Sequence, residues 1–334
     1  MKIAIVGAGA IGGYLGVRLA LAGEAVSFIA RGANLAAIRA GGMTLRSEAA
    51  GAEHAPGVAA FEHPEEAGPH DAVLLTVKAH QVAAVAGALR HLCRDDTAIV
   101  TMQNGIPWWY FHKHGGEHDG RPVRAADPDG SIARAIDPAR VIGSVVYPAA
   151  NLVAPGVVQH VEGNRVSLGE LDGATTPRIQ AIAAALTRAG LKAPILRDVR
   201  SEIWLKLWGN LCFNPISALT HATLAELCRF PTTRELAARM MAEAEQIARK
   251  LGVAMRISIE RRIAGAEQVG AHKTSMLVDV EQGRPIELDA LMGAVIELGE
   301  LTQTPAPYIT AVYACAGLLA QTLAASGGRL QVSP

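Results

Sequence analysis

The glycine-rich stretch at the start of the chain constrains the fold more than any other feature of the sequence. A short apolar run, residues 2–6, leads directly into GAGAIGG at residues 7–13, and a helical pattern continues to residue 22. In this strand–turn–helix context, GxGxxG indicates a dinucleotide-binding turn, with the helix N-terminus facing the phosphates. A glycine-rich turn with a purely structural role is the alternative. The residues expected to bind the cofactor are Gly7, Ala8, Gly9, Ala10, Ile11 and Gly12.

Apolar runs of strand length alternate with helical patterns over the first two hundred residues. Runs that are short, continuous and rich in β-branched residues are typical of parallel strands buried on both faces. The alternation therefore predicts a doubly wound parallel sheet with right-handed crossovers. The expected strands are residues 2–6, 25–30, 72–77, 97–102, 141–147, 156–161, 165–170 and 193–196, and the expected helices are residues 10–22, 33–40, 79–90 and 177–189.

The apolar periodicity becomes helical almost throughout from about residue 197. The expected helices are residues 199–213, 233–251, 285–300 and 307–325, with breaks at Pro215, Pro231, Gly283 and Pro305. We therefore expect an α/β fold followed by an all-α part. The predicted domains are a Rossmann-type, dinucleotide-binding domain over residues 1–196 and an all-helical domain over residues 197–334.

Charge and cysteine content limit the partners that this chain is expected to have. The 31 basic and 31 acidic side chains cancel, so the sequence gives no electrostatic signal for nucleic acid or an anionic membrane. Four cysteines without paired spacing suit a reducing cytoplasm. Residues 301–328 carry no charge, but their threonines, glutamines and prolines favour a buried or interface helix over a membrane span. We expect a cytoplasmic protein.

The end of the second predicted strand indicates which dinucleotide binds. An NAD site usually places an acidic residue about 20 residues past the glycines, where it accepts a hydrogen bond from the ribose 2′-hydroxyl. Here the stretch reads Ile29-Ala30-Arg31-Gly32, and the planar guanidinium of Arg31 suits a 2′-phosphate. The sequence therefore predicts NADP as the cofactor. An exposed loop arginine is the alternative.

Two polar residues follow otherwise apolar strands, Lys78 in LLTVKAHQV and Asn104 in TMQNG. Ligands of doubly wound sheets bind at the carboxyl ends of the strands, so both side chains are candidates to contact the cofactor or the substrate. A helix cap or a turn residue is an equally good interpretation of each.

Three polar residues form a line on an otherwise apolar helix. Lys206, Asn210 and Asn214 recur at i, i+4 and i+8 in RSEIWLKLWGNLCFN, so they share one helix face. Buried polar groups need partners, which favours a polar ligand at this line. The alternative is an ordinary amphipathic helix whose polar face lies in water.

Ser275 and Glu287 lie twelve residues apart in two further segments, HKTSMLVD and RPIELDA. We expect Glu287 just inside a helix opened by Pro285, where a carboxylate is electrostatically favoured. The alternative is that Glu287 merely stabilises that helix end.

Taken in order, these motifs resemble the ketopantoate reductases (2-dehydropantoate 2-reductases) over nearly the whole chain. The resemblance is carried by GAGAIG with Arg31, TVKAHQ, QNG, GVVQH, KLWGNLCFNPISAL, TSML and IELDA. It implies NADPH-dependent reduction of a 2-oxo acid to a 2-hydroxy acid, of the (R)-pantoate-forming type found in pantothenate biosynthesis. It further implies a small-molecule partner, a monomer or homodimer, and no metal.

The resemblance also implies a role for each candidate residue. The glycine-rich turn and Arg31 bind NADP, whereas Lys78 and Asn104 line the nicotinamide-ribose side. In the helical part, Lys206 is the proton donor. The substrate-binding residues are Asn210, Asn214 and Ser275. Glu287 contacts the substrate hydroxyl and the cofactor, and it positions Lys206. A protonated ammonium would stabilise and neutralise the alkoxide charge that develops on hydride transfer. A nearby carboxylate would oppose the fall in pKa that burial of Lys206 causes.

Two departures from the family pattern concern the substrate. Pantoate-forming members carry an additional substrate-binding asparagine where this chain has Leu224, and a longer segment follows QNG over residues 107–130. That segment begins with four aromatic residues, Trp108 to Phe111, which either anchor the loop, the favoured interpretation, or cap the substrate pocket. Its histidines are expected to be loop residues rather than metal ligands. Two alternative functions follow: the same reaction on a bulkier 2-oxo acid, or a non-catalytic NADP(H) sensor.

Overall fold

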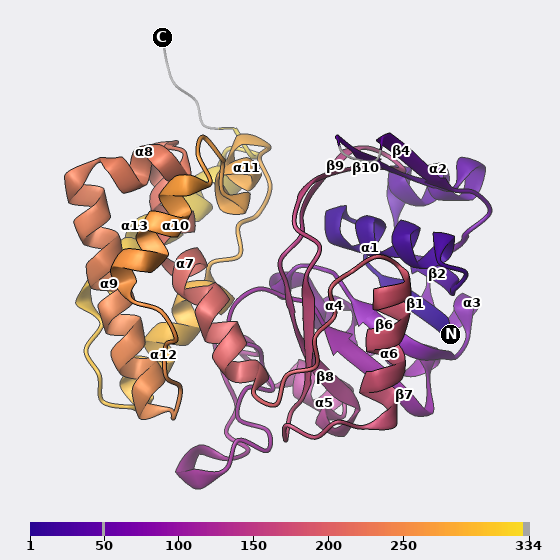
Figure 1. Cartoon of the computed structure of the whole chain (residues 1–334), viewed down its shortest axis with the longest axis horizontal. Helices are drawn as coiled ribbons and strands as arrows, with labels where there is room; N and C mark the ends of the chain where they lie inside the picture. Colours follow the sequence, from indigo (N-terminus) through magenta and orange to yellow (C-terminus); the bar gives the residue numbers. More distant parts are fainter. Residues whose placement is uncertain (49–50, 330–334) are drawn as a thin grey trace. The chain divides into compact units, whose positions relative to one another are not determined.

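The computed structural model describes residues 1–48 and 51–329 (Figure 1). The chain divides into two compact units. The N-terminal unit comprises Met1–Asn104, Trp109–Pro122 and Asp129–Val199. The helical unit comprises Gly105–Trp108, Val123–Pro128 and the chain from Arg200 onward. Two short loop segments thus belong to the second unit although they lie early in the sequence.

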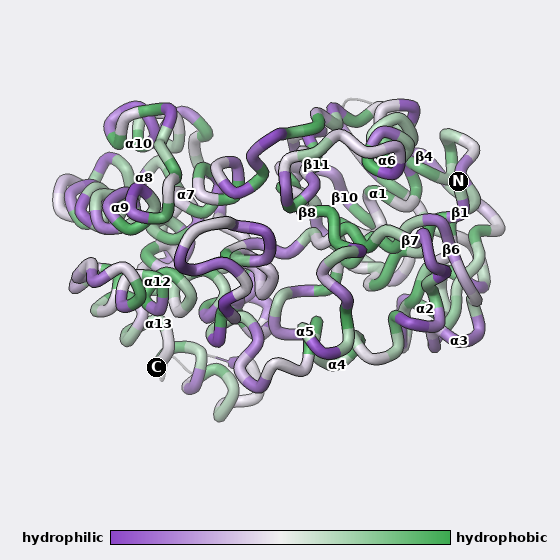
Figure 2. Tube along the Cα trace, turned by 90° about the horizontal axis from the view of Figure 1, so that it is seen from below, coloured by the Kyte–Doolittle hydropathy of each residue, from purple (hydrophilic) through white to green (hydrophobic). Residues whose placement is uncertain are grey.

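A seven-stranded sheet forms the centre of the N-terminal unit, in the order β11-β8-β7-β6-β1-β2-β5. All neighbouring strands are parallel except β11, which pairs antiparallel with β8. Its strands carry mainly apolar residues, clearly visible along β8 in Figure 2, and this confirms the predicted doubly wound sheet. The strands are β1 (Lys2–Val6), β2 (Ala25–Ile29), β5 (Ala59–Phe61), β6 (His70–Leu75), β7 (Cys93–Thr101), β8 (Val141–Val146) and β11 (Val166–Glu170).

Short helices connect these strands. The helix expected over residues 79–90 is broken, because two of its parts close as tighter 3₁₀ turns. The helices are α1 (Ala10–Leu21), α2 (Gly32–Gly41), α3 (Pro64–Ala67), α4 (Val82–Ala86), α5 (Ser131–Ala135) and α6 (Pro177–Arg188), and the 3₁₀ turns are η1 (Ala79–Gln81), η2 (Leu89–Leu92), η3 (Gly116–His118) and η4 (Pro138–Arg140).

A second, four-stranded sheet packs on the other side of α1, in the order β4-β3-β10-β9. The ring of Tyr14 on α1 stacks on His160 of β10 at 4.6 Å, and Arg18 pairs with Glu53 of β4 at 3.0 Å. The expectation that residues 156–161 belong to the main sheet is therefore wrong. The strands are β3 (Met43–Ser47), β4 (Gly51–Ala55), β9 (Ala149–Ala154) and β10 (Val157–Glu162).

The last strand expected in the N-terminal unit, residues 193–196, is also absent. This part of the described chain forms only one isolated bridge to β11, between Leu168 and Ile195. The physical reason is Pro194, which accepts a hydrogen bond from the Leu168 N–H through its carbonyl but has no N–H to donate.

The helical unit contains helices almost throughout, which confirms the predicted change of fold. Its longest helix, α7, passes through Pro215 instead of ending before it. Proline inside a helix costs about 3 kcal/mol, but the residues on both sides of Pro215 are buried and packing holds them helical. The helices are α7 (Val199–Thr220), α8 (Leu224–Arg229), α9 (Pro231–Lys250), α10 (Ile259–Gln268), α11 (Ser275–Glu281), the π-helical turn η5 (Asp289–Gly293), α12 (Ala294–Leu301) and α13 (Pro307–Ala325).

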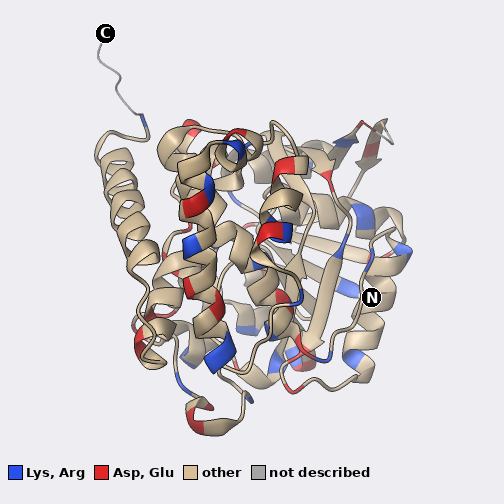
Figure 3. Ribbon diagram, turned by 60° about the vertical axis from the view of Figure 1, so that its left-hand side comes forward, with Lys and Arg blue, Asp and Glu red and all other residues tan. Residues whose placement is uncertain are grey.

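The last helix, α13, carries no charged residue and is therefore tan throughout in Figure 3. Its N-terminus is capped by Glu243 of α9, whose carboxylate accepts from the N–H groups of Tyr308 and Ile309, each at 2.9 Å. Its length and mean hydropathy of 1.4 would suffice to cross a membrane, although one such helix is weak support for a span. Only 22% of its most apolar window is buried. The expectation of a buried helix is wrong, and an interface role stays a prediction.

Candidate active site

The glycine-rich turn between β1 and α1 is tightly constructed. Gly7 adopts a φ of +105°, a conformation that favours glycine. The Thr76 hydroxyl donates to the carbonyl oxygens of Val6 and Gly7, at 3.0 and 2.7 Å. A Cβ atom at Gly12 would collide with the Gly7 carbonyl oxygen and lie 2.6 Å from Thr76 Oγ1. Helix and strand thus approach as closely as the sequence pattern predicts.

The backbone at the N-terminus of α1 is open at Gly9. A Cβ atom at Gly9 would meet nothing within 4 Å among the residues that the structure describes, so the backbone there is open to a ligand. The helix α1 begins at the next residue and has no acidic side chain in its first turn. An open helix N-terminus of this kind attracts phosphate groups through its backbone N–H groups and its dipole.

Arg31 lies at the start of α2, directly after β2, and its side chain is exposed. The neighbouring Asn34 donates from Nδ2 to the carbonyl oxygen of Ala8 and so ties α2 to the glycine-rich turn. The sequence between Ile29 and Asn34 contains no acidic residue. A positive charge therefore stands where an NAD site usually has a carboxylate.

Lys78 and Asn104 follow β6 and β7, which are parallel neighbours. Gln103 connects the two strand ends, because its Nε2 donates to the carbonyl oxygens of Leu75 and Val77, at 2.7 and 2.9 Å. The sequence analysis did not single out Gln103. Its position between a buried strand and Asn104 could have indicated a polar residue at the strand end. The carboxyl ends of β1, β2, β6 and β7 thus bring the N-terminal candidates to one edge of the sheet.

The polar line on α7 lies within an apolar setting. Lys206 and Asn210 are half-buried and Asn214 is only 6% exposed, so the helix face that carries them is not a fully solvated one. The opposite side is fixed by Trp208, which is fully buried and donates from Nε1 to the Met241 carbonyl oxygen at 2.7 Å. This anchor sets the rotation of α7 about its axis.

Lys206 has a perturbed acid–base equilibrium. Burial disfavours the charged ammonium and lowers the pKa of Lys206 from 10.5 to about 8, while the carboxylate of Glu287 acts in the opposite direction. A lysine with this pKa is still largely protonated at neutral pH and gives up its proton more readily than an ordinary lysine. The pair therefore has the properties of a general acid and the group that keeps it charged.

Glu287 does not lie inside a helix as expected. Residues 284–288 are irregular, and helical structure begins only at Asp289, as the π-helical turn η5. Ile286 and Leu288 are buried on either side of Glu287, which is half-buried. Ser275, for which the sequence analysis gives no helix position, is the first residue of α11.

The aromatic segment after QNG is buried. Trp108 to Phe111 are each at most 8% exposed. Trp109 Nε1 donates to Thr101 Oγ1 of β7 at 2.9 Å, and its ring covers Gly143 of β8. These contacts fit the favoured interpretation, that the aromatic residues anchor the loop.

Trp109→Phe is therefore expected to lower the free energy of unfolding by about 1–2 kcal/mol, because the smaller ring leaves space over Gly143 and the bond to Thr101 is lost. The order of kcat/KM values among 2-oxo acids should stay the same. Chemical denaturation and steady-state kinetics measure the two effects. A changed substrate order with unchanged stability would favour the pocket interpretation instead.

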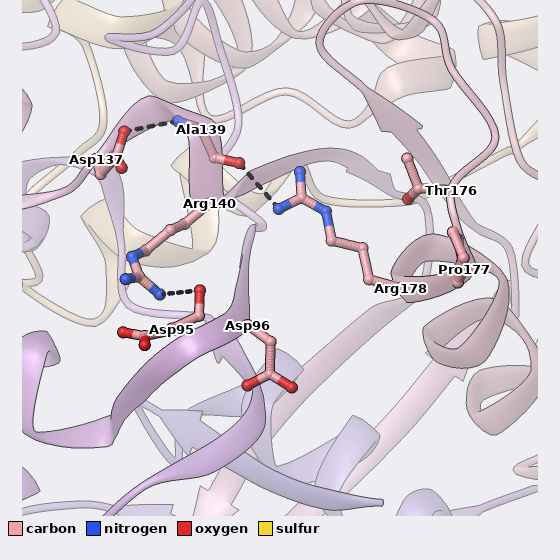
Figure 4. A pocket seen from close by; sticks show the side chains of 8 residues that line it. All are labelled: Asp95, Asp96, Asp137, Ala139, Arg140, Thr176, Pro177 and Arg178. Atoms are coloured by element: carbon pink, nitrogen blue, oxygen red, sulfur yellow. Dashed lines mark hydrogen bonds between the residues drawn. The ribbon is translucent and has the colours of Figure 1, made fainter.

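A surface cleft of about 410 Å³ lies elsewhere in the N-terminal unit (Figure 4). Asp95 and Asp96 near the start of β7 line it, together with Arg140 just before β8 and Arg178 at the start of α6. Arg178 is engaged by Glu170 and donates to the Ala139 carbonyl oxygen at 2.9 Å. This cleft lies at the amino ends of the strands, whereas ligands of doubly wound sheets bind at the carboxyl ends. It is not the dinucleotide site.

Comparisons with known proteins agree with this arrangement. The family described as "Ketopantoate reductase PanE/ApbA" matches residues 3–114, and "Ketopantoate reductase PanE/ApbA C terminal" matches residues 198–320. The 2-dehydropantoate 2-reductase of Mesorhizobium japonicum is 52% identical over 321 residues, which cover 96% of this chain and 98% of that protein.

Solved structures show the same fold. A structure from Ralstonia solanacearum MolK2 that carries the ketopantoate reductase name is 40% identical, with a TM-score of 0.91 over 97% of this chain and 98% of the other. The 2-dehydropantoate 2-reductase of Geobacter metallireducens is 30% identical, with a TM-score of 0.83 over 96% and 100% of the two chains.

Proposed function

The chain belongs to the ketopantoate reductase family of oxidoreductases, and from this premise we propose that it reduces 2-dehydropantoate to (R)-pantoate with NADPH. The observation that carries the proposal is the place of Lys206 on the polar line of an apolar helix, where burial lowers its pKa to about 8 and Glu287 opposes this shift. The name of the Mesorhizobium relative supports the substrate and a place in pantothenate biosynthesis. The domains that we propose for these roles are residues 1–196 for NADP and residues 197–334 for the substrate.

The N-terminal unit would hold the cofactor. In the turn from Gly7 to Gly12, the open backbone at Gly9 suits the pyrophosphate, and Arg31 suits a 2′-phosphate. Lys78 and Asn104, at the ends of β6 and β7, would contact the nicotinamide ribose. When bound, the cofactor supplies the hydride that reduces the ketone carbon.

The helical unit would supply the proton. Lys206 holds a proton at Nζ and delivers it to the ketone oxygen as negative charge develops there. Glu287 keeps Lys206 charged and contacts the substrate hydroxyl. Asn210, Asn214 and Ser275 orient the substrate through neutral hydrogen-bonding groups. We further propose a cytoplasmic enzyme that acts as a monomer or homodimer.

Purified protein mixed with NADPH and a panel of 2-oxo acids tests the reaction directly, through the loss of NADPH absorbance. We expect the highest kcat/KM for 2-dehydropantoate. A larger or more apolar 2-oxo acid is the second candidate, because Leu224 at the start of α8 replaces the additional asparagine of pantoate-forming members. Tight NADPH binding without turnover on any 2-oxo acid would instead favour a sensor.

Arg31→Ala is expected to remove most of a preference for NADPH over NADH. A single charge-assisted pair with the 2′-phosphate supports a preference of about 10-fold, or about 1.4 kcal/mol. The affinity for NADH should remain nearly unchanged, because NADH has no 2′-phosphate. Fluorescence titration of both nucleotides with wild type and variant measures this, and equal wild-type affinities would contradict the assignment.

A further inference from the structure

The interior of α7 contains a glycine whose place is taken by an arginine from another helix. Gly209 is fully enclosed in the sequence WLKLWGNLCF, where the surrounding side chains are large. A Cβ atom there would collide with Nη2 of Arg262 and lie 2.8 Å from its Cζ. The guanidinium of Arg262, on α10, therefore lies directly on the backbone of α7. Both residues belong to the helical unit.

This guanidinium lies beside the line of polar residues on α7. Its Cζ is 5.8 Å from the centre of the Phe213 ring, in a cation–π arrangement. A helix turns by about 100° per residue, so Gly209 and Phe213 lie about 60° and 20° around the axis from Lys206. The positive charge thus flanks the helix face that carries Lys206, Asn210 and Asn214.

The pairing of Gly209 with Arg262 has an energetic cost. Glycine inside a helix is about 1 kcal/mol less favourable than alanine. A half-buried guanidinium also loses part of its hydration. Its field extends into α7, where it opposes the rise in the pKa of the Cys212 thiol that burial causes. The guanidinium thus places a positive charge beside the proposed substrate-binding face, where it would favour an anionic group of the substrate.

We propose that Arg262 is a specificity-determining residue that binds a carboxylate of the substrate. The inference rests on the proposed function, in which Lys206 serves the ketone oxygen, Glu287 contacts the substrate hydroxyl, and no other cation of the helical unit is assigned to the substrate. A planar guanidinium matches a carboxylate through two parallel hydrogen bonds, which an amide or hydroxyl group does not reproduce. The carboxylate is either the one next to the ketone or a second one at the far end of the substrate.

Kinetics of Arg262→Gln test the proposal, with Arg261→Gln as matched control. Arg261 is the preceding residue of α10 and its side chain is exposed, so that variant removes the same charge away from α7. We expect Arg262→Gln to raise KM for the acid substrate by about 10-fold or more, with kcat changed by less than about 3-fold. Arg262→Lys should recover only part of this loss, whereas Arg261→Gln should behave as wild type.

Three substrates distinguish the two possible carboxylates: 2-dehydropantoate, its lactone, which has the ketone but no free carboxylate, and 2-oxoglutarate, which has a second one. If Arg262 binds the carboxylate next to the ketone, Arg262→Gln loses the preference for 2-dehydropantoate over the lactone. If it binds a distal carboxylate, the loss is confined to 2-oxoglutarate. An unchanged KM for both acids in Arg262→Gln overturns the proposal.

Gly209→Ala provides a second route if Arg262→Gln does not fold. It keeps every charge but puts a methyl group where the guanidinium lies, so KM for the acid should rise in the same direction. An unchanged KM in a folded Gly209→Ala would count against the proposal.

Calorimetric binding of the 2-oxo acids to the NADP complex separates this inference from the proposed function. If wild type has no turnover, the function fails, and the affinities of wild type and Arg262→Gln still decide whether Arg262 binds the carboxylate.

Discussion

Lys206→Ala is expected to lower kcat by about 10²–10⁴-fold, the range that a positioned general acid contributes. The expectation follows from the place of Lys206 on α7 and from its pKa of about 8, which make it a proton donor suited to neutral pH. The Kd for NADPH should change by less than about 3-fold, because the dinucleotide-binding turn is a separate part of the chain. Stopped-flow or steady-state reduction of a good 2-oxo acid, with nucleotide titration alongside, measures both quantities.

The same assignment predicts the pH profile. A proton donor acts only when protonated, so kcat/KM should be constant below the pKa of Lys206 and fall about tenfold per pH unit above it. With a pKa of about 8, the fall begins near that pH. Glu287→Gln removes the carboxylate that raises this pKa, so the descending limb should move to lower pH.

Lys250→Ala is a suitable control, since this exposed lysine of α9 only donates to the carbonyl oxygens of Thr302 and Gln303. It should keep wild-type turnover. Lys206→Ala and Glu287→Gln together should lose less than the sum of the single effects, because both residues serve one proton transfer. Near-wild-type turnover of Lys206→Ala on a substrate that wild type reduces well would refute the mechanism.

The sheet was predictable because its central strands are buried on both faces and therefore read as continuous apolar runs. The second sheet was not, because β10 is only partly buried and its sequence resembles that of a strand in the main sheet. Whether β10 pairs with β8 or with β3 depends on contacts far apart in the sequence. The hydrophobic pattern of the sequence therefore does not predict which strand pairs with β10.

Local rules also failed where packing or a missing N–H decided the outcome. Pro215 was expected to end α7, yet its buried neighbours keep the helix continuous to Thr220. Pro194, by contrast, prevents a strand in a segment that is otherwise apolar. The candidate residues themselves were accessible from strand ends and helix spacing, but Gln103, Thr76 and Arg262 act through contacts between segments that are distant in sequence.

Substitutions at Gly9 and Gly12 are expected to separate cofactor binding from stability. At Gly12 a methyl group collides with the Gly7 carbonyl oxygen and crowds Thr76, so Gly12→Ala should lower the free energy of unfolding by about 1–3 kcal/mol and impair NADPH binding too. At Gly9 the space is open, so Gly9→Ala should change the free energy of unfolding by less than about 1 kcal/mol.

The methyl group of Gly9→Ala nevertheless stands where the pyrophosphate approaches the backbone, and the Kd for NADPH should rise about 100-fold, equivalent to about 2.7 kcal/mol. Thermal or chemical denaturation without nucleotide, combined with NADPH titration, measures both effects for each variant.

Gly41 provides the control, because it lies at the end of α2 and a Cβ atom there would meet nothing within 4 Å among the described residues. Gly23 is unsuitable, because its φ of +87° would strain an alanine. Gly41→Ala should therefore leave both quantities near wild type. Wild-type NADPH affinity in Gly9→Ala would mean that the open space above the turn is not where the phosphates bind.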